Sequence, residues 1–294
     1  MKGKSTTFGA ISIVNAIAGG RGAAAGVRLA TDAEVELEEK PGRWTLVTNG
    51  KERESRLATE TVRLALKIDG KDPDQFSGRI ETRSSVPIGV GLKTSSASST
   101  AIALATYAAL GHRAYNPKEV LDCSVEASLS SGASVTGALD DAAACLLGGL
   151  NMTDNLGRKI VRSKLFDKSL KVVIKVPRRA SARQAMDPAF VRKFGKITDS
   201  FFQMCLQEEY WRAMVLNGLT YSSILKYDPF AALQAVEMGA LGAGLSGTGP
   251  AVAAVFESSR QKEMDALAER WREDGSATIV TETNNEHGRI SGLG

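Results

Sequence analysis

The sequence has little histidine or cysteine. Among its 294 residues are only two histidines, His112 and His287, and three cysteines, Cys123, Cys145 and Cys205. The cysteines are odd in number and widely spaced, so the sequence contains neither a disulfide framework nor a CxxC pair for zinc or redox chemistry. Sites built on imidazole or thiolate clusters are therefore implausible. Unpaired thiols favour a reducing, cytoplasmic location.

Long hydrophobic runs and a strong charge imbalance are also missing. The longest apolar stretch, around residues 101–110, is far shorter than the roughly 18 residues that indicate a membrane span. Asn15 interrupts the first apolar run, unlike the core of a secretory signal. Lys and Arg exceed Asp and Glu by 37 to 33, a net charge of +4, which is too small to indicate a nucleic-acid partner. We expect a small anionic substrate, no membrane or nucleic-acid partner, and leave a homodimer open.

The remaining pattern predicts an α+β protein with two domains. A chain of this length usually divides into about two folding units. Hydrophobic and acidic residues alternate from 32 to 38, which is the period of a half-buried strand. The strands are few and short among the helices, which favours an α+β arrangement over a large doubly wound sheet. Polar residues at about 155–165 suggest a boundary that divides the chain into residues 1–158 and 159–294.

Local signals locate the individual elements. Asn116 followed by Pro117 is typical of a helix start, because the Asn side chain caps the first turn and Pro fits its first position. The ranges 97–110, 187–209 and 259–272 are expected to be helical, as are the ranges 55–70, 210–225 and 232–241 and the stretches that start at 116 and near 140. Strands are expected within 5–48 and at 78–84, 170–177, 251–256 and 277–283.

The most informative segment is the loop Ser84 to Ala97, SSVPIGVGLKTSSA, between a strand and a buried helix. Gly89 and Gly91 allow backbone amides to approach an anion, and the following helix N-terminus adds partial positive charge. Lys93 supplies a full charge, and the hydroxyls after it can bind phosphate or a magnesium ion. The segment differs from the P-loop motif, because Lys93 follows a leucine. The alternative is a serine-rich helix cap without a ligand.

A second glycine-rich segment, residues 242–247, matches the pattern GxGxxG. That pattern binds dinucleotides where it follows a strand and opens a helix. Here it follows a predicted helix and precedes the strand at 251–256, so the dinucleotide interpretation fails. The glycine loop LSGTGP at 245–250 remains to be explained.

Paired carboxylates form the third segment, EASLSSGASVTGALDDA, in which Asp140 and Asp141 follow a run of small residues. Adjacent aspartates most often cap helices or face solvent. Among small neighbours, however, one carboxylate can accept the proton of a hydroxyl group, and another can hold magnesium. Glu126 is the other acid close in sequence.

Together, the three segments resemble the GHMP kinase superfamily. Its signature, Pro-x3-Gly-Leu followed by small residues and Ser-Ser-Ala, corresponds to Pro87, Gly91-Leu92 and 95–97, one residue longer than the commonest spacing. The late glycine motif of the family matches residues 245–250. The stretches 9–27, 91–98 and 134–145 are most similar to archaeal-type shikimate kinases. The resemblance covers essentially the whole chain.

The resemblance implies a fold and an activity. The first domain would have the fold of ribosomal protein S5 domain 2, and the second a ferredoxin-like fold, with ATP and Mg²⁺ between them. The activity would be transfer of the γ-phosphoryl group of ATP to the 3-hydroxyl of shikimate, in the route to aromatic amino acids. Several family members carry a lysine in the first glycine motif, which here reads Phe8-Gly9-Ala10-Ile11. The absent lysine keeps open a nucleotide-binding protein that has lost catalysis. A kinase of the same superfamily acting on homoserine or mevalonate is the nearest alternative.

The same resemblance assigns roles to residues. Asp140 would take the substrate proton, with Asp141 beside it, and Ser96 and Glu126 would bind Mg²⁺. Ser246, Gly247 and Thr248 would close over the phosphates and the substrate. A guanidinium is expected to hold the substrate carboxylate, and the candidates are Arg21 and Arg178, followed by Arg179 and Arg183. The nucleotide would contact Val86, Pro87, Ile88, Gly89, Val90, Gly91, Leu92, Lys93, Thr94, Ser95, Ser96 and Ala97.

Overall fold

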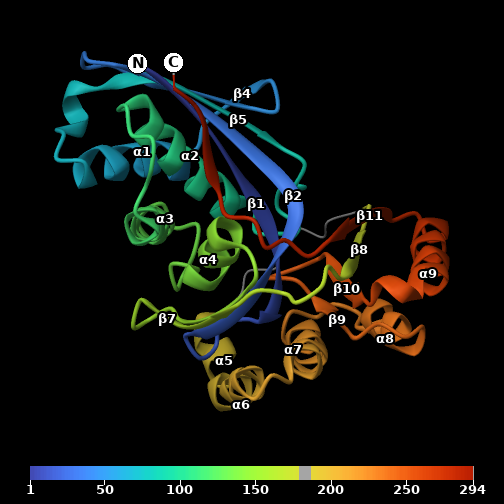
Figure 1. Cartoon of the computed structure of the whole chain (residues 1–294). Coiled ribbons are helices and arrows are strands. Elements are labelled where there is room, and N and C mark those ends of the chain that lie inside the picture. Colours follow the sequence, from blue (N-terminus) through green and yellow to red (C-terminus); the bar gives the residue numbers. More distant parts are fainter. Residues whose placement is uncertain (179–186, 294) are drawn as a thin grey trace.

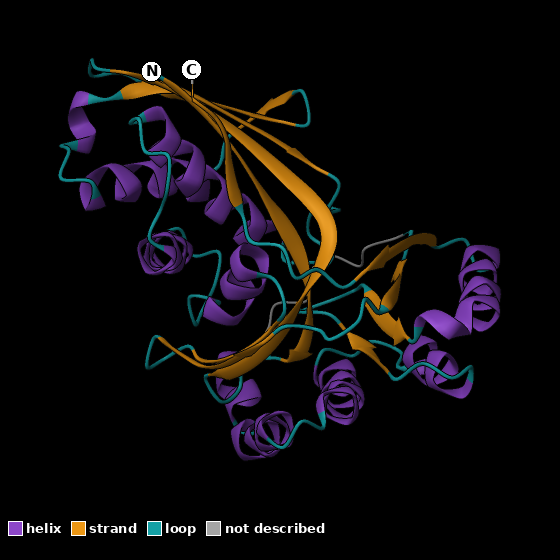
Figure 2. Ribbon diagram, in the orientation of Figure 1, coloured by secondary structure: helices purple, strands orange, loops and turns teal. Residues whose placement is uncertain are grey.

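Two β-sheets with helices packed against them make up the chain (Figures 1 and 2). The structure, a computed structural model, describes residues 1–178 and 187–293. The larger sheet is built on two long antiparallel strands, β1 (Lys2–Val14) and β2 (Arg21–Glu38). Its main path runs β12-β1-β2-β5-β3-β4, and β6 and β7 continue from β2. The other strands of this sheet are β3 (Trp44–Thr48), β4 (Lys51–Arg53), β5 (Ser77–Ser84), β6 (Leu150–Asp154), β7 (Lys159–Lys164) and β12 (Arg289–Leu293).

Four helices cover one face of the larger sheet in the first half of the chain. They are α1 (Arg56–Ile68), α2 (Thr94–Ala109), α3 (Pro117–Ser130) and α4 (Leu139–Leu147). The side chain of Ser55 accepts a hydrogen bond from the Ala58 backbone and so caps α1, and Asn116 caps α3 through Lys118. Almost every residue of α2 is buried, as expected for the Ala, Ile and Leu run, and this helix begins at Thr94 rather than at Ala97.

The smaller sheet is antiparallel throughout, in the order β11-β8-β10-β9. Its strands are β8 (Lys171–Val176), β9 (Gly242–Leu245), β10 (Val252–Phe256) and β11 (Ala277–Glu282). Helices α8 (Phe230–Glu237) and α9 (Gln261–Glu273) pack on it around the buried Trp271. The other helices are α5 (Pro188–Arg192), α6 (Gly195–Leu206) and α7 (Tyr210–Ile224), and short 3-10 turns occupy Pro73–Gln75 and Ser258–Arg260.

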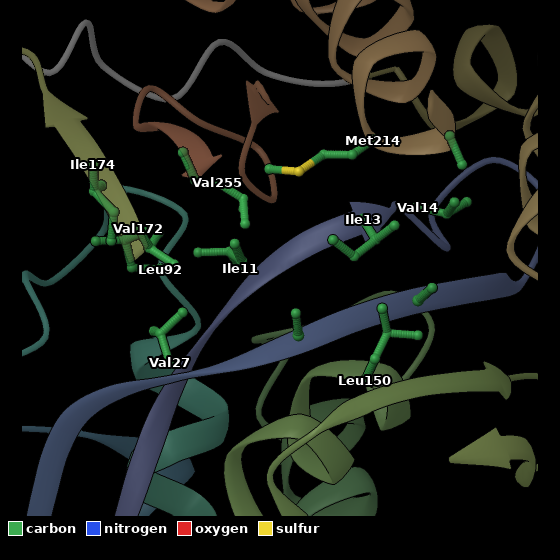
Figure 3. Close-up of a cluster of buried hydrophobic side chains, with 14 of the residues drawn as sticks. Ile11, Ile13, Val14, Val27, Leu92, Leu150, Val172, Ile174, Met214 and Val255 are labelled. Carbon is green, nitrogen blue, oxygen red and sulfur yellow. The ribbon is translucent and has the colours of Figure 1, made fainter. Parts of the chain in front are cut away.

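One hydrophobic core joins the two sheets. Ile11 and Ile13 of β1 lie in the same buried cluster as Ile174 of β8, Val255 of β10 and Met214 of α7 (Figure 3). Burial of such side chains is worth roughly 2 kcal/mol each. The cluster therefore fixes the smaller sheet against the end of β1, where the chain turns towards β2.

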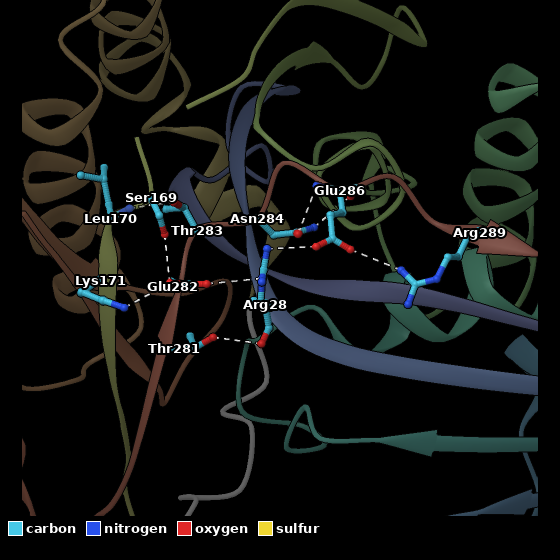
Figure 4. Close-up of polar contacts among 10 residues, drawn as sticks. All are labelled: Arg28, Ser169, Leu170, Lys171, Thr281, Glu282, Thr283, Asn284, Glu286 and Arg289. Carbon is cyan, nitrogen blue, oxygen red and sulfur yellow. Dashed lines mark hydrogen bonds and ion pairs between the residues drawn. The ribbon is translucent and has the colours of Figure 1, made fainter. Parts of the chain in front are cut away.

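The C-terminal segment crosses from the smaller sheet to the larger one. Thr283 exchanges hydrogen bonds with the Leu170 backbone at 2.9 and 3.0 Å. Arg28 of β2 pairs with Glu286 at 2.9 Å and with Glu282 at 3.5 Å (Figure 4). The chain then ends in β12, which pairs with β1. Strand β12 is thus part of the larger sheet.

The domain boundary expected after residue 158 does not coincide with the change from one sheet to the other. That position lies in the turn between β6 and β7, and both strands belong to the larger sheet. The polar stretch at 155–165 resembles a linker in sequence because β7 is largely exposed. The change of sheet falls between β7 and β8, and β12 returns to the larger sheet afterwards.

Candidate active site

Three loops meet around a cavity of about 390 Å³. The first follows β5 and leads into α2, the second leads into α4, and the third joins β9 to β10. Asn15, Ala16 and Ile17, from the turn after β1, complete the wall next to Leu225 and Tyr227. All three segments that sequence analysis singled out therefore contribute to one cavity.

The first loop has the backbone of a phosphate cradle. Gly89 and Gly91 have φ values of 78° and 91°, in the left-handed region that glycine adopts at little cost. A Cβ on Gly91 would overlap the carbonyl oxygen of Ser246, so this glycine also allows the third loop to approach. Half of the twelve residues predicted to contact the nucleotide line the cavity: Gly89, Gly91, Lys93, Thr94, Ser95 and Ser96.

The other six residues of that prediction do not line the cavity. Val86, Val90, Leu92 and Ala97 are buried in the hydrophobic clusters and anchor the loop. Pro87 accepts a hydrogen bond from the Thr94 hydroxyl at 2.8 Å, and Ile88 is exposed without lining the cavity.

Lys93 brings a positive charge to the point where the three loops meet. Its Nζ lies 2.8 Å from Oδ1 of Asp141, and both side chains are almost buried, at 8% and 15% exposure. A Cβ added to Gly247 would lie 3.3 Å from the same Nζ. Among the described residues that line the cavity, Lys93 is the only cation. It has a left-handed backbone, with φ 62°, a strained conformation of the kind that gathers at functional sites.

Asp140 occupies the first turn of α4 and is 4% exposed. Burial raises the pKa of its carboxyl to about 7, and the charge of neighbouring Asp141 acts in the same direction. Lys93 and a hydrogen bond from Asn155 oppose this rise but do not cancel it. A carboxyl with a pKa near neutral pH is suited to accept a proton during catalysis.

Asp141 and Ser96 supply oxygen atoms that suit a magnesium ion. Oδ1 of Asp141 is buried and has no hydrogen-bond partner, since Lys93 is close to it but not aligned as a donor. Ser96 lines the same cavity. In the part of the chain that the structure describes, no three His, Cys, Asp or Glu side chains gather into a metal site. Magnesium bound here would take several ligands from phosphates and water, as it commonly does.

Two family models match the chain. The model described as GHMP kinases N terminal domain matches residues 56–149, and the one described as GHMP kinases C terminal matches residues 230–277. Shikimate kinase of Methanothrix thermoacetophila is 35% identical over 290 residues, which cover 99% of this chain and 96% of that protein. Shikimate kinase of Methanosarcina acetivorans is 38% identical over 285 residues, covering 97% and 95%. The chain belongs to the GHMP kinases.

A solved structure supports the same fold. The structure of L. major mevalonate kinase in complex with R-mevalonate matches this GHMP kinase with a TM-score of 0.70 at 14% identity, and covers 97% of each chain. The GHMP kinase fold, in the α+β class, is therefore confirmed. In this kinase, none of the helices within residues 1–178 and 187–293 has the length and apolar character needed to cross a membrane.

The structure does not bring every predicted site residue of the kinase to the cavity. Glu126, predicted to bind magnesium, is not among the lining residues and pairs with Arg158. Ser246 is fully buried and does not line the cavity either; its hydroxyl donates to the Gly91 carbonyl at 2.8 Å. Gly247 and Thr248 do line it. Ser246 therefore fastens the third loop to the first.

The two described candidates for binding the substrate carboxylate, Arg21 and Arg178, also lie outside the cavity wall. Nη1 of Arg21 contacts Oδ1 of Asp199 on α6 at 2.9 Å, and its guanidinium lies over the ring of Phe202. Arg178 is exposed and outside the cavity wall. Arg179 and Arg183 lie outside the described residues. Arg21 is close to the glycine motif in sequence, but its side chain points to α6.

Arg21→Ala is expected to change the KM for the phosphoryl acceptor less than about twofold. The reason is that Arg21 forms an exposed ion pair away from the cavity, and such pairs are worth little. Steady-state kinetics with a saturating concentration of ATP would measure this. An increase in KM of tenfold or more, without loss of folding, would instead place the guanidinium at the substrate.

Sequence analysis overlooked several residues of the site. Asn15, noted only as an interruption of an apolar run, donates from Nδ2 to the Gly247 carbonyl at 2.9 Å and so orients the third loop. Nothing in the sequence around Tyr227 indicated that it lines the cavity. The loop 132–136 was seen as a row of small residues, and it forms one wall of the cavity.

Proposed function

We propose that this GHMP kinase transfers the γ-phosphoryl group of ATP to the 3-hydroxyl of shikimate, giving shikimate 3-phosphate and ADP. The observation that carries the proposal is the junction of three loops, which combines a glycine cradle, a buried cation and two carboxylates in one cavity. The acceptor is taken from the archaeal shikimate kinases that match nearly the whole chain at 35% and 38% identity.

The chain's own groups account for binding of the phosphates. Backbone amides at Gly89 and Gly91, with the N-terminus of α2, would face the phosphates, and Lys93 would neutralise their charge. Phosphoryl transfer depends mainly on such positioning and electrostatic stabilisation. Magnesium held by Ser96 and Asp141 would supply further neutralisation of the phosphate charge.

Asp140 would act on the acceptor. The hydroxyl proton passes to the Asp140 carboxylate while the hydroxyl oxygen bonds to the γ-phosphorus, and the bond from that phosphorus to the β,γ-bridging oxygen breaks to release ADP. The acceptor would lie beside Thr136, Thr248 and Tyr227, which line the cavity and carry hydroxyls that can bond to those of shikimate.

The test is an assay of ADP release with shikimate, homoserine or mevalonate as the acceptor, combined with identification of the product by phosphorus NMR. We expect stimulation by shikimate, with the phosphate on its 3-oxygen. Stimulation by homoserine or mevalonate but not by shikimate would reject the proposed acceptor. ATP binding without stimulation by any of the three would favour a non-catalytic nucleotide-binding protein.

The rate should depend on pH through Asp140. Its carboxyl has a pKa of about 7, so below that pH it is protonated and cannot take the hydroxyl proton. We expect kcat/KM for shikimate to fall about tenfold per pH unit as the pH drops below 7, and to level off above it. A profile from about pH 5 to about 9 would measure this, and a flat acidic side would contradict the role of Asp140.

A further inference from the structure

Asn155 lies behind the catalytic carboxylate, just after β6. It is 2% exposed and does not line the cavity. Its Nδ2 donates to Oδ1 of Asp140 at 2.8 Å. In return, its Oδ1 accepts from the Asp140 backbone N–H at 3.3 Å and from the Thr153 hydroxyl at 2.6 Å. Asn155 and Asp140 thus bond to each other twice.

These contacts determine which way the Asn155 amide points. A backbone N–H can only donate, so the oxygen of the amide must face the N–H of Asp140. The amide nitrogen then faces the carboxylate. With its orientation fixed in this way, Asn155 presents a donor to Asp140 in both protonation states of that group. A donor to a carboxylate stabilises its charged form.

Asn155 also joins Asp140 to the cavity loop before α4 and to the turn before β2. Its Nδ2 lies 3.3 Å from the Thr136 hydroxyl in the loop before α4, and its backbone N–H donates to the Gly20 carbonyl at 2.8 Å, in the turn before β2. The second oxygen of Asp140 lies against Gly22, where a Cβ would overlap it. The carboxyl is therefore held on both sides.

We infer that Asn155 is a positioning residue for phosphoryl transfer, which orients the Asp140 carboxylate without touching the substrate. The inference rests on the proposed function only in that Asp140 is taken as the proton acceptor. The hydrogen bonds between Asn155 and Asp140 can be tested in the free protein, without any substrate.

The variant Asn155→Asp has nearly the same shape, but it replaces the amide donor with a second acid. We expect kcat to fall by at least about tenfold, because the Asp140 carboxylate loses the donor that orients it. The KM for ATP should change less than about twofold, because Asn155 is outside the cavity. Asn155→Ala, which removes the donor without adding charge, should also lower kcat with little change in the KM for ATP.

Asn151→Asp is the matched control. Asn151 is also buried, on β6, and its Nδ2 donates to the Gly148 carbonyl at 2.7 Å. Its side chain makes no hydrogen bond to Asp140, so kcat should stay within about twofold of the parent value. An unchanged kcat in the Asn155 variants, or an equal loss of kcat in Asn151→Asp, would overturn the inference.

A measurement on the unsubstituted protein avoids any question of misfolding. In NMR spectra of the free protein, the side-chain amide signal of Asn155 should be shifted by its hydrogen bond to Asp140, and this shift should be lost in Asp140→Ala. Absence of that change would overturn the inference. The change without shikimate-dependent ADP release would instead reject the proposed function and leave the contact standing.

Discussion

Asp140→Asn should lower kcat by about 10²- to 10⁴-fold, the usual contribution of a positioned acid or base, while the protein still binds ATP. The amide has almost the shape of the carboxyl but cannot accept the hydroxyl proton. Its oxygen can still accept the hydrogen bond from Asn155, so the surroundings should persist. Single-turnover kinetics would measure the loss, and calorimetry would measure ATP binding.

Asp141→Asn separates the two adjacent acids. It removes the charge that faces Lys93, and it should weaken magnesium-dependent ATP binding together with turnover. Unchanged turnover in Asp140→Asn would remove Asp140 from its role. A loss confined to Asp141→Asn would give the proton-accepting role to Asp141.

Lys93→Met should lower kcat by about 10²- to 10³-fold, the scale on which removal of one preorganised donor acts. Within the described cavity wall no other cation is available to replace it. Lys93 also contacts Asp141, so the substitution would leave a buried carboxylate without its counter-charge. Rapid-quench kinetics with saturating ATP would show the loss.

Lys175→Met is a suitable control for Lys93. Lys175 is also largely buried, at 16% exposure, and pairs with an aspartate, Asp274, but it lies on β8 away from the cavity. Its replacement should leave kcat within about twofold. Loss of activity in both variants would indicate destabilisation, and retained activity in Lys93→Met would show that the phosphate charge is neutralised by other groups.

The position of Lys93 also bears on the lysine missing from the first glycine motif. Residues 8–11 of β1 provide no cation, and Phe8 and Ala10 are buried. Lys93 arises from the loop before α2, in the stretch that is one residue longer than the common family spacing, and reaches the carboxylate pair from there. A charge beside the paired acids is thus present in this kinase, although its first glycine motif lacks the lysine that several family members carry there.

Local signals predicted much of the fold. The cap at Asn116 depends on neighbouring residues and was predicted, and α1 and α3 begin within one residue of the expected position. Strand β9 was not predicted, because its sequence GAGL has no β-branched residue. Its glycines instead permit contact with Gly218 of α7. Strand β12 was missed because its pairing with β1 joins opposite ends of the chain.

In the site too, features contained in a short stretch of sequence were predicted, whereas contacts between distant residues were not. Glycines, hydroxyls and paired acids identified the three loops, since each loop's chemistry is contained in a short stretch of sequence. The ion pairs were not predictable: Arg21 is bound by Asp199, and Lys93 by Asp141, at separations that only the fold closes. The ion pair between Glu126 and Arg158, in the turn after β6, was not predictable for the same reason.

The burial of Asp140 also affects the stability of the folded chain. The pKa of this carboxyl is about 7 in the folded protein, against 3.8 for an exposed aspartate. Between these pH values the unfolded chain releases a proton that the folded chain retains, so the free energy of unfolding falls as the pH rises through this window. Above about pH 7 this decrease in the free energy of unfolding is complete. The kinase thus keeps, at the centre of its cavity, a side chain that opposes its own folding under the conditions in which that side chain would be active.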